Sequence, residues 1–165
     1  MKTILTLLVV CLSVAVTVAQ TDMSADKLIR KSDEGNRAEV TTGQLALQNS
    51  NDTQIQQWAA KIVEDHQQAN VKVKELAKAH NVQLNDGVTK AHKDLADKLS
   101  SLNGEAFDRE YLNHMEKAHK ANIEFYEQQA ETAPAEDLRN YFRDTLPALK
   151  SHLAKVQELQ KSRNQ

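Results

Sequence analysis

The chain has 165 residues, of which 27% are charged and 40% are hydrophobic. Its 4 Gly and 2 Pro are too few for the many tight turns of a β-sandwich or barrel, which favours an all-α fold. With 21 Lys and Arg against 23 Asp and Glu the net charge is −2, so the chain lacks the basic excess typical of nucleic-acid-binding proteins. We therefore expect no nucleic-acid partner.

Residues 1–19 have the pattern of a secretory signal peptide. Lys2 supplies the positive start, a short apolar run follows, and small residues precede a cleavage point after Ala19. The run is shorter than the roughly 20 residues of a membrane span. A retained membrane anchor and a lipid anchor on Cys11 are the weaker alternatives. Cleavage leaves one domain over residues 20–165, and we expect no transmembrane span in that mature chain.

Removal of Cys11, the only cysteine, excludes much site chemistry. An exported chain without cysteine has no disulfides, thiolate nucleophiles, zinc–thiolate sites or iron–sulfur clusters. Any metal must then be held by histidine, carboxylate or methionine. The sequence also contains no G-x-S-x-G nucleophile elbow, which disfavours a serine hydrolase.

Four long amphipathic segments, each bounded by capping or helix-breaking residues, follow in chain order. The segments cover residues 24–48, 51–80, 105–131 and 134–161. Asn51 with Gln54 is the expected capping pair of the second segment. The connection 81–103 contains a shorter helical pattern after the expected cap Asn85-Asp86. No segment shows the apolar alternation of a β-strand.

Four long helices with one long middle connection predict a ferritin-like four-helix bundle. In that arrangement a short extra helix lies in the connection between the second and third long helices, and the connection crosses the length of the bundle. The alternative is an up-down-up-down bundle with the small helix at one end. Both alternatives are all-α.

Three- and four-residue steps along each helix place a polar residue among its inward-facing positions. Glu39 lies near the centre of the first long helix, His66 at that of the second and His119 near that of the third. His152 lies within about one turn of the centre of the fourth. In the third helix a neighbouring stripe through His114 competes with the stripe through His119. Because midpoints stay level whichever way the helices run, we expect the four residues to converge.

This set of side chains favours a mononuclear metal site. Imidazole nitrogens and a carboxylate oxygen suit Fe, Zn, Mn, Cu or Ni. Glu39 needs a partner, since an unpaired buried carboxylate is destabilising or has a raised pKa. A water-mediated network of neutral histidines around Glu39 is the metal-free alternative. A di-iron centre is disfavoured because it needs Glu-x-x-His on two helices, and only Glu116-x-x-His119 fits.

Motifs on all four long helices are similar to those of a known family. They are Gly35-x-x-Ala38-Glu39-Val40-x-x-Gly43, Ile62-Val63-x-Asp65-His66, Phe107-Asp108-x-x-Tyr111-Leu112-x-x-Met115-x-x-x-His119 and Leu146-Pro147-x-Leu149-x-x-His152-Leu153. The chain resembles the ferritin-like family of bacterial exported proteins of unknown function, often labelled outer membrane proteins. The resemblance implies a ferritin-like bundle and export to the periplasm or the outer membrane, and it supplies no settled activity.

The resemblance assigns this chain's four polar core residues to the polar core positions of the family. They are Glu39, His66, His119 and His152. Asp65 matches the family's acid before the histidine of the second helix. Asp65 and Glu116 are the expected outer partners that orient the ligands. The chain departs from the family at Lys117-Ala118, where an acid often stands beside the histidine of the third helix.

Two functions fit these residues. The first is a metal-binding protein of the bacterial envelope that holds one transition-metal ion in the bundle core. The second is a non-catalytic module for envelope stress or adhesion, with a hydrogen-bonded polar core and an envelope protein or a second copy as partner. The first function predicts a tightly bound metal. The second predicts a metal-free protein whose stability changes with pH, because histidine titrates near pH 6.5. Whether the chain is an enzyme stays open.

Overall fold

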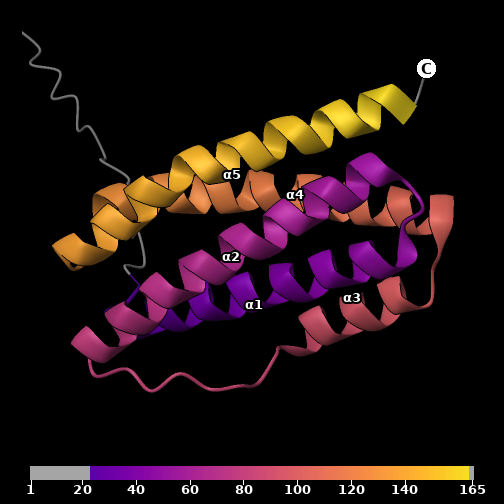
Figure 1. Cartoon of the computed structure of the whole chain (residues 1–165). Helices are drawn as coiled ribbons and strands as arrows, with labels where there is room; N and C mark the ends of the chain where they lie inside the picture. The colour runs from indigo at the N-terminus through magenta and orange to yellow at the C-terminus, as the bar shows by residue number, and fades with distance from the viewer. Residues whose placement is uncertain (1–22, 164–165) are drawn as a thin grey trace, which may run out of the picture.

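The computed structural model describes residues 23–163, a range that contains helices and no strands (Figure 1). The helices are α1 (Ala25–Asn49), α2 (Thr53–Ala79), α3 (Lys90–Ser100), α4 (Gly104–Thr132) and α5 (Glu136–Arg163). The predicted all-α class is confirmed, with four long helices and a short one between the second and third. The signal peptide predicted for residues 1–19 lies outside the described residues. Within the described range, every helix is too short or too polar to cross a membrane.

Two apolar clusters fill the two ends of the bundle and show the direction of each long helix. One cluster joins the end of α1 and the start of α2 to the start of α4 and the end of α5, through Ala46, Ile55, Phe107 and Leu159. The other cluster joins the four opposite ends. Helices α1 and α5 therefore run one way, and α2 and α4 run the other way. The connection that carries α3 crosses the length of the bundle, as in the first of the two predicted topologies (Figure 1).

Short polar side chains set the starts of the first two helices. Helix α1 begins after Ser24, whose side chain caps it. At α2 the Asp52 carboxylate accepts the backbone N–H groups of Gln54 and Ile55 at 2.8 and 3.3 Å. The cap is therefore Asp52 and not Asn51 as predicted, because one carboxylate satisfies two N–H groups that the helix leaves unpaired.

Arg37 of α1 holds the crossover connection in a non-helical path. Its guanidinium donates hydrogen bonds to the backbone oxygens of residues 85–87 at 2.9–3.1 Å. Its Nε atom also pairs with the buried Asp33 carboxylate at 2.9 Å. Since these carbonyls are engaged by a side chain, α3 begins only after the N-cap Thr89, later than the predicted cap at residues 85–86.

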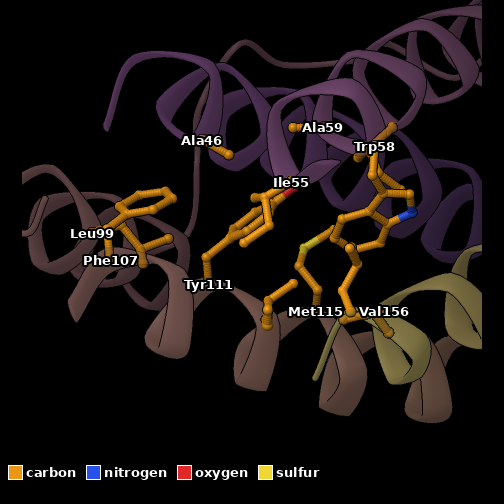
Figure 2. Packing of buried hydrophobic residues seen from close by; sticks show 12 residues of the cluster. Ala46, Ile55, Trp58, Ala59, Leu99, Phe107, Tyr111, Met115 and Val156 are labelled. Carbon is orange, nitrogen blue, oxygen red and sulfur yellow. The ribbon is translucent and has the colours of Figure 1, made fainter. Parts of the chain in front are cut away.

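The inner edge of the first apolar cluster borders the middle of the bundle. Figure 2 shows Trp58, Tyr111 and Met115 in that cluster. The Trp58 ring centroid lies 5.8 Å from that of Tyr111 and 6.5 Å from that of His119. The apolar core thus gives way directly to buried polar side chains at the level where the sequence predicts them.

Candidate metal centre

Three of the four predicted site residues meet in the middle of the bundle. His66 of α2, His119 of α4 and His152 of α5 each offer one ring nitrogen, and these nitrogens all lie within 4.8 Å of one another. The ring centroids are 5.3–6.2 Å apart. Each histidine is at most 5% exposed. The three helices therefore bring three imidazoles to one buried point.

The outer nitrogen of each ring faces an oxygen of the surrounding protein. The contacts are His66 Nδ1 with Asn36 Oδ1 (3.0 Å), His119 Nδ1 with the Met115 carbonyl oxygen (2.9 Å) and His152 Nε2 with Asp65 Oδ2 (2.9 Å). Amide, carbonyl and carboxylate oxygens accept hydrogen bonds, so each outer nitrogen carries the proton and donates it. The lone pair of the other nitrogen then points inward, which is the arrangement that orients histidine ligands around metals.

The inward nitrogens lack partners that could satisfy their lone pairs. His119 Nε2 and His152 Nδ1 face each other at 3.3 Å. Within residues 23–163, the buried His66 Nε2 has no hydrogen-bond partner. Nitrogen ligands about 2 Å from one ion lie about 3.3–3.5 Å apart in tetrahedral or trigonal geometry. The His119–His152 pair already has this spacing, and a cation between the rings would remove the repulsion of their lone pairs.

Burial keeps the three rings neutral at physiological pH. Desolvation lowers the pKa of His66 to about 3, helped by the neighbouring histidines, and lowers the pKa of His119 to about 4. Desolvation also lowers the pKa of His152, opposed by its hydrogen bond to Asp65. Neutral imidazole is the form that coordinates metals, so no proton has to leave the rings before an ion binds.

Glu39 of α1 is buried nearby but stands apart from the cluster. Among the described residues the group within mutual ligand distance consists of the three histidines, without Glu39. The Glu39 side chain is 5% exposed, and its Oε2 atom has no hydrogen-bond partner in the described part of the chain. Burial raises its pKa to about 7, opposed by electrostatic interactions with His152 and His92. Such a carboxyl readily loses its proton when positive charge arrives.

The two predicted outer partners differ in what they contact. Asp65 hydrogen-bonds His152 and also pairs with Lys61 at 2.7 Å. Glu116 instead accepts hydrogen bonds from Lys120 at 2.7 Å and Gln157 at 3.3 Å. Glu116 therefore links α4 to α5. Within the described range it forms no hydrogen bond with a histidine.

Asn36 is the partner that sequence analysis missed. Besides accepting from His66, it donates from Nδ2 to the Tyr141 hydroxyl at 3.4 Å. The Tyr141 hydroxyl in turn lies 3.4 Å from the Tyr126 hydroxyl. A buried chain of polar groups thus supports His66 from α1, α4 and α5. The available signal was the position of Asn36, three residues before Glu39 on the same helix face.

The fold is shared with proteins of known structure. A DUF305 protein from Streptomyces coelicolor, provisionally described as secreted, is 15% identical with a TM-score of 0.73, over 86% of this chain and 94% of that chain. A DUF305 fragment from Deinococcus radiodurans is 10% identical with a TM-score of 0.72, over 82% and 93%. CopM in its Cu(I)-bound form is 12% identical with a TM-score of 0.71, over 86% and 98%.

The sequence itself identifies the family. No curated protein is a significant match to the chain. Residues 13–159, however, match the family described as Domain of unknown function (DUF4142). That range includes all four polar core residues and the five helices except the last residues of α5. The chain therefore belongs to the DUF4142 family.

Proposed function

We propose that this protein binds one copper ion in the bundle core through His66, His119 and His152. The observation that carries the proposal is that one ring nitrogen of each of these three buried histidines lies within 4.8 Å of the other two. Imidazole suits copper, and Cu(II) has the highest affinity for such sites among the divalent first-row metals. CopM, which is similar in fold, has been solved with Cu(I) and with Cu(II). That likeness supports the choice of copper over Fe, Zn, Mn or Ni.

Glu39 is the fourth proposed member of the site. An ion held by three neutral imidazoles carries uncompensated positive charge in a buried environment, which is unfavourable. Since burial raises the pKa of Glu39 to about 7, the arriving ion makes its carboxyl release a proton and supply one negative charge nearby. Asp65 and Asn36 act through the rings, because they orient His152 and His66.

The proposed role is the holding or transfer of copper in the bacterial envelope. We propose that residues 1–19 direct export and are removed, and that residues 20–165 form the single mature domain. The apolar N-terminal run and the provisional description of the Streptomyces coelicolor neighbour as secreted support export. The crossover topology supports a relationship to ferritin-like bundles. The resemblance to exported bacterial proteins supports a location in the periplasm or at the outer membrane.

Trp58 provides the test, because it is the only tryptophan and its ring lies 6.5 Å from His119. Cu(II) bound to His119 would lie close to this ring and should quench its fluorescence. We expect titration of the metal-free protein to reach saturation at one equivalent, and His66→Ala and His119→Ala to lose saturable quenching. His80→Ala is the matched control, since His80 pairs with Asp137 at one end of the bundle.

The metal-free alternative predicts a different outcome of the same titration. If the core is only a hydrogen-bonded network, wild type and control should show no saturable quenching, and elemental analysis should find no metal. The histidine variants would then be less stable without any change in copper binding. That result would reject the copper proposal and favour a structural or interaction module of the envelope.

A further inference from the structure

A cavity of about 240 Å³ connects the surface of the molecule with His66. The buried side chains of Asn36, His66 and Tyr126 are among those that line its inner part. The half-buried side chains of Glu34 and His92 lie among its outer lining. The larger groove of about 1060 Å³ along α4 and α5 is lined by other described residues and by none of the three histidines. The smaller cavity therefore reaches the candidate site at His66, the one of the three histidines that lines it.

Glu34 and His92 place two potential metal ligands at the opening. His92 Nδ1 lies 3.2 Å from Glu34 Oε1, within ion-pair distance although the two atoms are not aligned for a hydrogen bond. The same carboxylate oxygen accepts the Thr89 backbone N–H at 2.9 Å. That bond attaches the start of α3 to α1 and fixes the carboxylate beside the ring. The crossover connection thus brings an imidazole to the outer part of the cavity.

We propose that this cavity is the path by which the metal ion reaches the core, and that Glu34 and His92 are its first binding point. The inference rests on the proposed copper site. A histidine ring lines each end of the path: His92 lies beside Glu34 on the outside, and His66, whose buried Nε2 has no hydrogen-bond partner among the described residues, lies on the inside. A carboxylate beside an imidazole attracts a hydrated cation, and a site with three imidazoles then holds the ion more tightly.

Lys31 also lines the cavity, and its contact limits the repulsion of an arriving cation. Its Nζ atom lies over the Phe125 ring, 3.7 Å from the centroid. This cation–π contact keeps the ammonium group against the wall. The carboxylate of Glu34 also offsets its charge. The outer part of the path therefore remains accessible to a positive ion.

Gly35 allows the path to be closed without a change to any proposed ligand. Gly35 lines the cavity, and a Cβ atom built there meets no atom of the described structure within 4 Å. The Leu side chain of Gly35→Leu should therefore fill the cavity. Gly35→Ala adds only one methyl group, which leaves most of the cavity open, and alanine favours the helix more than glycine does, so it is the matched control.

The experiment measures copper loading by stopped-flow quenching of Trp58 after the metal-free protein is mixed with Cu(II). Gly35→Leu, Glu34→Gln and His92→Ala should load several-fold more slowly than wild type, yet bind the same single equivalent at equilibrium. Gly35→Ala should load at the wild-type rate. Circular dichroism checks that each variant is folded, and the two rim variants provide the test if Gly35→Leu is not.

Three outcomes would contradict the account, and each can be told apart from the others. Wild-type loading rates in Gly35→Leu, Glu34→Gln and His92→Ala, in chains that still bind one equivalent, would overturn the path alone. A wild-type chain that takes up no copper would overturn both the proposed function and the path. Loss of equilibrium binding in His92→Ala would also contradict the proposal, because it would make His92 a permanent ligand.

Discussion

Glu39→Gln should stabilise the metal-free protein at alkaline pH, because it removes a buried negative charge. It should also weaken metal binding, because the proposed site uses that charge. Burial raises the pKa of Glu39 from 4.5 to about 7, so the folded chain holds this proton more tightly than the unfolded chain does. As the pH rises from about 4.5 to 7, the unfolded chain loses the proton first. The contribution of Glu39 to the free energy of unfolding therefore falls across that window.

The size of the effect follows from the shift. The difference between 7 and 4.5 is 2.5 pKa units, and each unit corresponds to about 1.36 kcal/mol. The ionised carboxylate therefore destabilises the metal-free fold by at most about 3.4 kcal/mol above pH 7. Glutamine has nearly the same shape and no charge, so the variant escapes this penalty. Effects of the new amide on packing are common to every pH.

Urea denaturation of both proteins at pH 5 and pH 8, with chelator present, isolates the charge. The stability of Glu39→Gln relative to wild type should rise by about 2–3 kcal/mol between the two pH values. The same variant should bind copper more weakly, because it supplies no negative charge. A stability difference that is the same at both pH values would refute the argument from burial. Unchanged copper affinity would refute the proposed role of Glu39 in the site.

Four further predictions test other parts of the structure. Metal-free wild type should lose stability as the pH falls from about 6.5 to 4, because the unfolded chain takes up protons at His66 and His119 that the folded chain does not bind. These two lowered pKa values outweigh the single raised pKa of Glu39, which acts in the opposite direction. Thermal unfolding should show the loss, and a flat profile would contradict it. Asn36→Ala should weaken copper binding about 10–100-fold in chelator competition, since His66 loses its outer acceptor, and wild-type affinity would contradict this. Arg37→Ala should speed proteolysis of the crossover connection, whereas an unchanged cleavage rate would show that its three hydrogen bonds are dispensable. Gly43→Ala should destabilise the fold by about 1–3 kcal/mol in urea, because its Cβ would lie 2.8 Å from a side chain of α2; wild-type stability would mean that the helices separate easily.

The positions of the three histidines could be predicted because they depend on helix geometry alone. Apolar periodicity gives the inward face of each helix, and residues near the midpoints stay level in any bundle topology. His66, His119 and His152 satisfied both conditions, and their rings meet. Glu39 satisfied them too, yet it stands outside the histidine group. Its distance depends on helix rotation and rotamer, which periodicity does not determine.

Features that depend on contacts between distant segments could not be predicted. The start of α3 follows from Arg37, which binds carbonyl groups about fifty residues further along the chain. The partnership of Asn36 with His66 requires the relative rotation of α1 and α2. The cavity at Gly35 arises where the crossover connection passes over α1. None of these leaves a periodic signal in the sequence.

The central claim concerns which atoms hold the ion, and X-ray absorption at the copper edge measures this most directly. We would load the protein with one equivalent of copper, desalt it and record the spectrum beside that of His66→Ala. The account predicts nitrogen neighbours at about 2 Å with the scattering pattern of imidazole in wild type, and little retained copper in the variant. Copper that is lost on desalting, or that has only oxygen or sulfur neighbours, would contradict a three-histidine site.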